Sequence, residues 1–125
     1  MILDTNSLSA FADGLPVAVS TVHAANSVEI SVVSLGEFRF GIAQSRHRIA
    51  YERWLHDNLR YYRILDVDQE TAAIYAEIRL ELKQAGRPIP VNDLWIAAQS
   101  RQHEMPVLSR DRHFDVVKGL RRVGW

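Results

Sequence analysis

Short apolar runs alternate along the chain with longer stretches in which apolar residues recur every three or four positions. The longer stretches predict helices packed on one face. Because strands separated by helices pair side by side in parallel, we expect an α/β fold, a three-layer α/β/α sandwich around a mostly parallel central sheet. The apolar runs predict strands at Ile2–Leu3, Val28–Val33, Tyr62–Val67, Pro106–Leu108 and, at the edge, Arg121–Trp125.

Capping residues and helix breakers place the first predicted helices. Asn6 or Ser7 caps a first short helix, which Gly14 ends. Pro16 opens a second short helix, at a position where its missing N–H costs nothing. Ser34 is expected to cap the helix that follows the second strand.

Three further helices are predicted in the second half of the chain. The stretch Arg46–Arg60 is amphipathic. Asp68 caps a long helix that Gly86 ends. After the proline-rich segment Arg87–Pro90, which is extended, a last helix covers Asn92–Glu104.

Composition narrows the class of protein. A chain of 125 residues, 47% hydrophobic and 24% charged, is typical of one globular domain covering residues 1–125. It has no cysteine, which excludes disulfides, thiolate nucleophiles and cysteine-ligated zinc. No apolar run reaches the roughly 18 residues of a membrane helix, and the N-terminus is acidic by Asp4. We therefore expect a cytoplasmic protein without a membrane partner.

The formal net charge is zero, but the charges are unevenly distributed. Residues 1–38 contain acidic residues and no lysine or arginine, whereas residues 39–63 are rich in arginine. Cations and polyanions could each find a matching surface, although ordinary solvated helix faces account for the pattern equally well.

Four carboxylates fall where the predicted elements meet one edge of the sheet. In parallel sheets, ligands bind beyond the carboxyl ends of the strands. Crowded carboxylates raise one another's pKa unless a cation neutralises them, and oxygen ligands favour Mg²⁺ or Mn²⁺ over zinc. Such an ion can activate water against a phosphodiester. The four residues are Asp4, Glu37, Asp93 and Asp111.

Each of these residues also has a purely structural interpretation. Asp4 and Asp111 are possible helix caps, and Asp93 would favour a helix N-terminus. Glu37 would be an ordinary solvated residue of a helix. Apolar neighbours weaken these interpretations jointly, because carboxylates in apolar surroundings need partners.

Four segments, in order along nearly the whole chain, resemble the PIN-domain ribonucleases and, within them, the VapC toxins of bacterial toxin–antitoxin pairs. One such segment would be weak support, but four in order are specific. The segments are Ile2–Asn6 (ILDTN), Ile30–Phe38 (ISVVSLGEF) with Gly41 beyond it, Pro90–Ala98 (PVNDLWIAA) and Val107–Phe114 (VLSRDRHF).

The resemblance implies a PIN-like sandwich with Mg²⁺- or Mn²⁺-dependent endonuclease activity on RNA. It makes the four acids the catalytic, metal-binding set. It also implies a homodimer and a cognate antitoxin, whose peptide binds beside the first helices and offers an arginine to the carboxylates. Residues at the family's supporting polar positions are Thr5, Asn6, Ser34 and Ser109.

Some residues depart from the family pattern or compete for a role. Only three residues precede Asp4, and Ser7 stands where the family usually has an apolar residue after Asp-Thr-Asn. Both departures are expected to cost stability. Asp115 is a rival of Asp111 for the fourth acidic position; Asp111 is preferred because it is nearer the strand end. His113 is interpreted as a surface or packing residue rather than a general base.

Two other functions are compatible with such a fold. A non-catalytic binding module would keep the fold without turnover, although its loss of activity would usually show as a missing acid. A Mg²⁺-dependent phosphatase would use Asp4 as nucleophile, but Asn6 stands where such enzymes need a second acid.

Overall fold

Five short strands form one parallel sheet at the centre of the computed structural model, which describes residues 1–125. The strand order is β3-β2-β1-β4-β5, and every neighbouring pair runs parallel. The two edge strands are therefore β3 and β5. The bounds are β1 Ile2–Leu3, β2 Glu29–Ser31, β3 Arg63–Leu65, β4 Val107–Leu108 and β5 Arg122–Val123.

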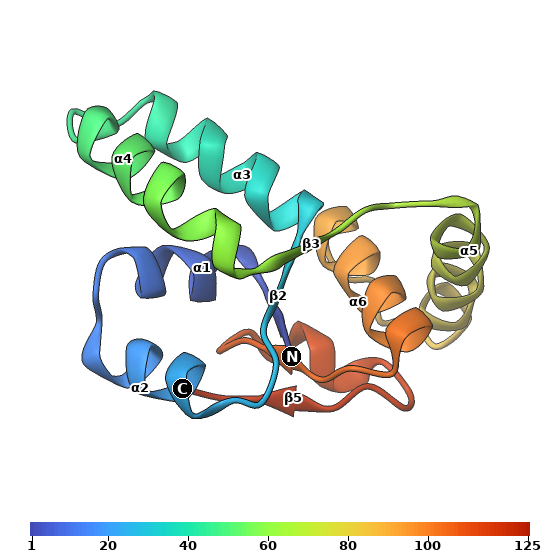
Figure 1. Ribbon diagram of the computed structural model, residues 1–125. Helices are drawn as coiled ribbons and strands as arrows, with labels where there is room; N and C mark the ends of the chain where they lie inside the picture. The colour runs from blue at the N-terminus through green and yellow to red at the C-terminus, as the bar shows by residue number, and fades with distance from the viewer.

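Six α-helices and two short 3₁₀ helices surround the sheet. Helices α1 to α4 lie on one side of it and α5 and α6 on the other (Figure 1). None of them combines the length and apolar character that crossing a membrane requires. The bounds are α1 Thr5–Ala12, α2 Pro16–Ala24, α3 Val32–Ala43, α4 Arg48–Asn58, η1 Leu59–Tyr61, α5 Gln69–Gln84, α6 Val91–His103 and η2 Arg112–Val116.

Side chains of the central strands alternate between two hydrophobic cores. Ile2 packs into the core beneath α5, α6 and η2, whereas Leu3 packs into the core beneath α1 to α4. Val107 and Leu108 divide in the same way, as the two-residue period of a strand requires. All four side chains are fully buried. The predicted three-layer α/β/α sandwich with a parallel sheet is thereby confirmed.

Two helices begin earlier than their predicted caps. Helix α1 is capped by Asp4 rather than by Asn6 or Ser7, and α3 is capped by Ser31 rather than by Ser34. The hydroxyl of Ser31 accepts the backbone N–H two residues later, at 3.1 Å, and so ends β2 and starts the helix at Val32. The β-branched pair after Ser31 is therefore helical, because the local cap overrides a strand preference.

The ends of α5 agree with the sequence pattern. Asp68 caps the helix in a reciprocal capping box with Thr71. The Asp68 carboxylate also accepts the side-chain amide of Gln102 at 3.0 Å, which joins the start of α5 to the end of α6. Gly86, with a φ of 67°, terminates the helix in the left-handed region where glycine is favoured.

Candidate functional site

Asp4 is held in a fixed orientation where β1 passes into α1. It is only 4% exposed. One carboxylate oxygen accepts the backbone N–H of Ser7 at 2.9 Å and caps the helix. The other accepts the hydroxyl of Ser109, which directly follows β4. Both carboxylate oxygens therefore have a donor, one from α1 and one from the residue that follows β4.

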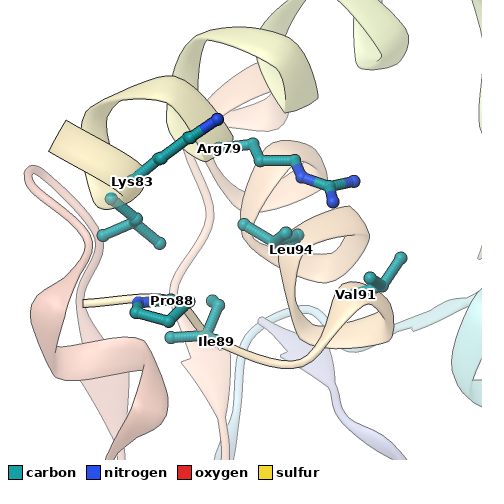
Figure 2. A pocket seen from close by; sticks show the side chains of 7 residues that line it. Arg79, Lys83, Pro88, Ile89, Val91 and Leu94 are labelled. Atoms are coloured by element: carbon teal, nitrogen blue, oxygen red, sulfur yellow. The ribbon is translucent and has the colours of Figure 1, made fainter. Parts of the chain in front are cut away.

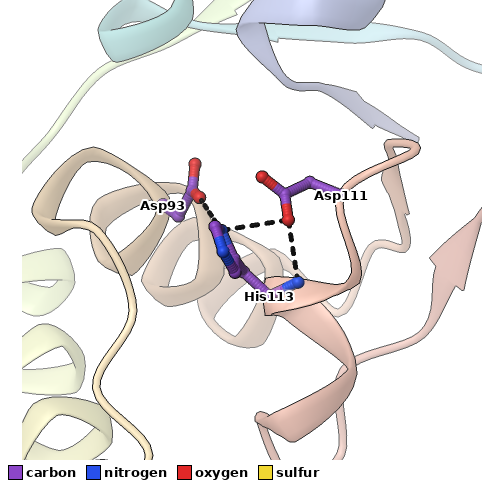
Figure 3. A group of neighbouring side chains, drawn as sticks. All are labelled: Asp93, Asp111 and His113. Carbon is purple, nitrogen blue, oxygen red and sulfur yellow. Dashed lines mark hydrogen bonds and ion pairs between the residues drawn. The ribbon is translucent and has the colours of Figure 1, made fainter.

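Asp93 and Asp111 face each other across a histidine ring. Asp93 lies in the first turn of α6, and Asp111 caps η2 just beyond β4. The Nδ1 atom of His113 lies 3.3 Å from Oδ2 of Asp93 and 3.0 Å from Oδ1 of Asp111 (Figure 3). One ligand atom from each of the three residues lies within 4.8 Å of the others, so the group is able to hold a metal ion.

The electrostatics of this cluster favour a cation. Burial raises the pKa of Asp93; the hydrogen bond to His113 opposes that rise, and the negative charges of Asp111 and Asp4 add to it. Asp4 therefore lies close enough to act on Asp93 even though it is outside the tightest group. A divalent cation would remove both the burial penalty and the repulsion.

Glu37 stands beside this cluster and is tied to it through neighbours of the other acids. Its carboxylate accepts the hydroxyl of Thr5, which follows Asp4 in sequence. It also accepts the side-chain amide of Asn92, which precedes Asp93. The structure thus brings Asp93 and Asp111 close together, keeps Asp4 within electrostatic reach, and holds Glu37 at the margin.

The predicted supporting residues differ in what they contact. Thr5 and Ser109 each donate a hydroxyl to one of the four acids. Ser34 is fully buried and donates to the carbonyl of Leu3 at 3.0 Å, which fixes α3 against the end of β1. Asn6 is exposed on α1 and has no hydrogen bond to any of the four carboxylates.

Ser7 is buried and connects the start of α1 to the end of β4 and to the C-terminal residue. Its buried hydroxyl donates to the carbonyl of Leu108 at 2.7 Å and accepts the indole Nε1–H of Trp125 at 2.7 Å. A buried hydroxyl with both partners carries no desolvation penalty of the kind expected for an orphaned group. These two hydrogen bonds offset the burial of the Ser7 hydroxyl, and the cost in stability relative to an apolar residue stays a prediction.

Asp115, the rival for the fourth acidic position, is paired elsewhere. Its carboxylate binds the guanidinium of Arg122, with distances of 2.8 and 3.1 Å. Arg122 holds the pKa of Asp115 below its usual range. The same guanidinium donates to the carbonyl of Ser109 at 3.1 Å, so this pair braces the turn that carries Asp111.

Two residues that contact the acids were not assigned to the site from the sequence. Asn92 gave no signal beyond its place beside Asp93. His113 was interpreted as a surface or packing residue, yet its ring contacts two of the acids. The position of His113 two residues after Asp111 brings it near that acid, but its contact with Asp93, 20 positions away, has no local signal in the sequence.

A separate cavity of about 360 Å³ lies between α5 and the segment that leads into α6 (Figure 2). Its apolar residues include Leu82, Ile89 and Leu94, and its charged residues are Arg79 and Lys83 of α5. No acid lines it, so it offers no ligand set for a hard cation. This cavity is therefore not a candidate metal site, in contrast to the carboxylate cluster.

Comparisons with known proteins agree with this arrangement. Residues 1–120 match the model of the PIN domain family. Ribonuclease VapC5 of Mycobacterium tuberculosis is 33% identical over 98 residues, which cover 77% of this chain and 73% of that protein. The crystal structure of FitAcB from Neisseria gonorrhoeae is 28% identical, with a TM-score of 0.83, and the match covers 97% of this chain and 94% of that one.

A further solved structure supports the fold alone. VapBC2 from Rickettsia felis, bound to a DNA fragment from its promoter, matches with a TM-score of 0.90 at 23% identity, over 99% of this chain and 97% of that one. Its similarity extends through the sheet and both helical layers. The family match and the identity to a VapC ribonuclease, which do not depend on this structure, lead to one conclusion: this chain belongs to the PIN-domain family, in its VapC branch.

Proposed function

We propose that this chain is the toxin of a toxin–antitoxin pair, a metal-dependent endoribonuclease that hydrolyses phosphodiester bonds in RNA. The observation that carries the proposal is the convergence of Asp4, Asp93 and Asp111 at one edge of the sheet, from segments far apart in the chain. Membership of a family that includes a VapC ribonuclease supports the reaction class.

A divalent cation of the hard class fits the residues present. Three carboxylates share one electrostatic environment, and burial together with the charges of Asp111 and Asp4 raises the pKa of Asp93. We propose Mg²⁺ or Mn²⁺ as the ion, held by Asp4, Asp93 and Asp111 with Glu37 at the margin. When bound, the ion neutralises these acids and supplies the Lewis acidity needed to hydrolyse a phosphodiester.

The remaining polar residues act by holding the acids in place. Ser109 and the N–H of Ser7 fix the two oxygens of Asp4. Thr5 and Asn92 fix those of Glu37. Supporting hydrogen bonds of this kind set the orientation of carboxylate ligands and tune their affinity for a metal. In this proposal none of the chain's residues needs to act as a nucleophile.

A groove next to the acids is the proposed binding place of the antitoxin peptide. It is lined by Thr5 of α1, by Glu37, Phe38 and Ile42 of α3, and by Tyr51 of α4. An arginine of the peptide entering at the Glu37 end would pair with the carboxylates and compete with the metal ion. We further propose one PIN-like domain over residues 1–125, a homodimer and a cytoplasmic location.

The test is cleavage of total cellular RNA by antitoxin-free protein with Mg²⁺ or Mn²⁺, and with EDTA. The proposal expects discrete fragments that disappear with EDTA and with Asp93→Asn. Asp57→Asn is the matched control, because Asp57 is an exposed acid of α4. Circular dichroism verifies that each variant is folded. If folded wild-type protein binds metal but cleaves no RNA, the chain is a binding module and the nuclease proposal fails.

A further inference from the structure

His113 occupies the position in the acidic cluster at which a ligand to an ion would be expected. Its ring comes from η2 and lies between the carboxylates of Asp93 and Asp111 (Figure 3). The same nitrogen, Nδ1, approaches both acids, at 3.3 and 3.0 Å. An ordinary surface ion pair contributes little to stability and has no need for two acids around one nitrogen.

Nδ1 of His113 cannot donate a full hydrogen bond to both of the carboxylates that it approaches. A histidine Nδ1 carries at most one proton, so it can donate to only one of the two carboxylates at a time. The other acid then receives no proton from the ring, in a site whose charges already repel. A divalent cation would satisfy all three atoms together, because an unprotonated nitrogen and both carboxylates can each donate a lone pair to it.

The two distances from Nδ1 of His113 agree with a shared coordination shell. In an octahedral shell with bonds of about 2.1 Å, neighbouring ligand atoms lie roughly 3.0 Å apart. Nδ1 of His113 lies 3.0 Å from the Asp111 oxygen and 3.3 Å from the Asp93 oxygen. The distances require little rearrangement to accept an ion.

Hydrogen bonds of the backbone hold Asp111 and His113 in this arrangement. The hydroxyl of Ser109 accepts the N–H of Asp111 at 2.8 Å, and Asp111 Oδ1 accepts the N–H of His113 at 2.9 Å. Successive hydrogen bonds of this kind fix the turn from the end of β4 into η2. The ring is half exposed, at 50%, so an ion and its water ligands can reach it.

We propose that His113 is a nitrogen ligand of the metal ion at this site, beside Asp93 and Asp111. The inference rests on the proposed function, because it assumes that the acids hold a metal. Mg²⁺ strongly prefers oxygen ligands, whereas Mn²⁺ and later transition ions accept imidazole. A site with His113 in it therefore binds Mn²⁺ in preference to Mg²⁺, and this preference is lost with the imidazole.

The experiment is electron spin-echo spectroscopy of Mn²⁺ bound to untagged protein, which detects nitrogen directly coordinated to the ion. Wild type is compared with His113→Gln and with the matched control His56→Gln, since His56 lies 3.3 Å from Asp57 in another exposed histidine–aspartate pair. Nitrogen modulation is expected in wild type and in His56→Gln and is expected to vanish in His113→Gln. A Mn²⁺ titration should show an affinity loss of about tenfold or more for His113→Gln, with Mg²⁺ affinity changed less.

The outcomes separate this inference from the function on which it rests. Mn²⁺ that binds wild type without nitrogen modulation, and is lost with Asp93→Asn, overturns the role of His113 and leaves the metal centre standing. An unchanged Mn²⁺-over-Mg²⁺ preference in folded His113→Gln also overturns it. If wild type binds no Mn²⁺, the metal centre of the proposed function fails, and the role of His113 fails with it.

Discussion

The hydroxyl of Ser109 donates to the carboxylate of Asp4 across 105 positions of sequence, joining the end of β4 to the end of β1. The same hydroxyl accepts the backbone N–H of Asp111 at 2.8 Å. One small side chain thus fixes the relative position of two acids of the candidate site. Their geometry depends on a fully buried group that has no direct role in chemistry.

Ser109→Ala should therefore weaken metal binding without removing a ligand. We expect affinity for Mg²⁺ or Mn²⁺ to fall about tenfold, as for other residues that orient ligands. We also expect a loss of about 1–2 kcal/mol in the free energy of unfolding, because a buried hydrogen bond is removed. Metal titration and urea denaturation measure the two effects. Ser20→Ala, at an exposed hydroxyl of α2, should change neither.

Asp93→Asn should stabilise the metal-free protein while abolishing RNA cleavage. Burial raises the pKa of Asp93 in the fold, so this residue's contribution to stability is fully present below the unfolded pKa and is lost as the pH rises through the folded pKa. At pH 7 in EDTA, the neutral amide removes the penalty. Differential scanning calorimetry should show a melting temperature higher by about 2–5 °C. A lower melting temperature would contradict the electrostatic account.

The contribution of Asp68 to stability should have the opposite dependence on pH. The backbone N–H of Thr71 lowers the pKa of Asp68, so its contribution to stability is present above the unfolded pKa and is lost as the pH falls through the folded one. Asp68→Ala should lower the melting temperature by about 3–6 °C at pH 7 and by much less near pH 3. Thermal melts across this range test it, beside Asp57→Ala at an exposed acid. An equal loss at both pH values would refute the role of the charge.

Substitution of Asp111 should reduce RNA cleavage strongly, whereas substitution of Asp115 should not. Asp111→Asn removes a member of the candidate metal site, and we expect RNA cleavage to fall by about a hundredfold or more. Asp115→Asn keeps an oxygen for Arg122, so its cleavage rate should stay within about twofold of wild type. Initial rates on one RNA substrate, with melting temperatures as a folding check, decide the comparison. A larger loss for Asp115→Asn would reverse the assignment.

Much of the fold is readable from the chain because its patterns are local. Ile2–Leu3 and Val107–Leu108 are apolar pairs beside turn residues, and Asp68 with Gly86 brackets a clear helical period. The start of α3 was misplaced because Val32 and Val33 favour strands by themselves. Their helical state depends on Ser31 and on packing, which no short window of sequence contains.

The candidate site was readable for a different reason. Parallel topology brings the residues that follow β1 and β4, Asp4 and Asp111, to one edge of the sheet, and Asp93 was placed with them from its position in the first turn of the helix that leads to β4. His113 could not be placed there, because its partner Asp93 lies 20 positions away and only the turn after β4 aims the ring at it. The hydrogen bonds of Ser7 could not be predicted for the same reason, since both its partners are remote in sequence.

The bond from Trp125 to Ser7 has a practical consequence for spectroscopy. Of the three tryptophans, Trp54 packs against Phe11 and Trp95 stacks on Tyr75, whereas the indole of Trp125 is hydrogen-bonded to the hydroxyl that also holds the end of β4. In a Trp54→Phe, Trp95→Phe background, the tryptophan fluorescence comes from Trp125 alone. Its emission should shift when that hydroxyl moves, so the molecule carries an optical probe of the strand edge at which the carboxylates converge.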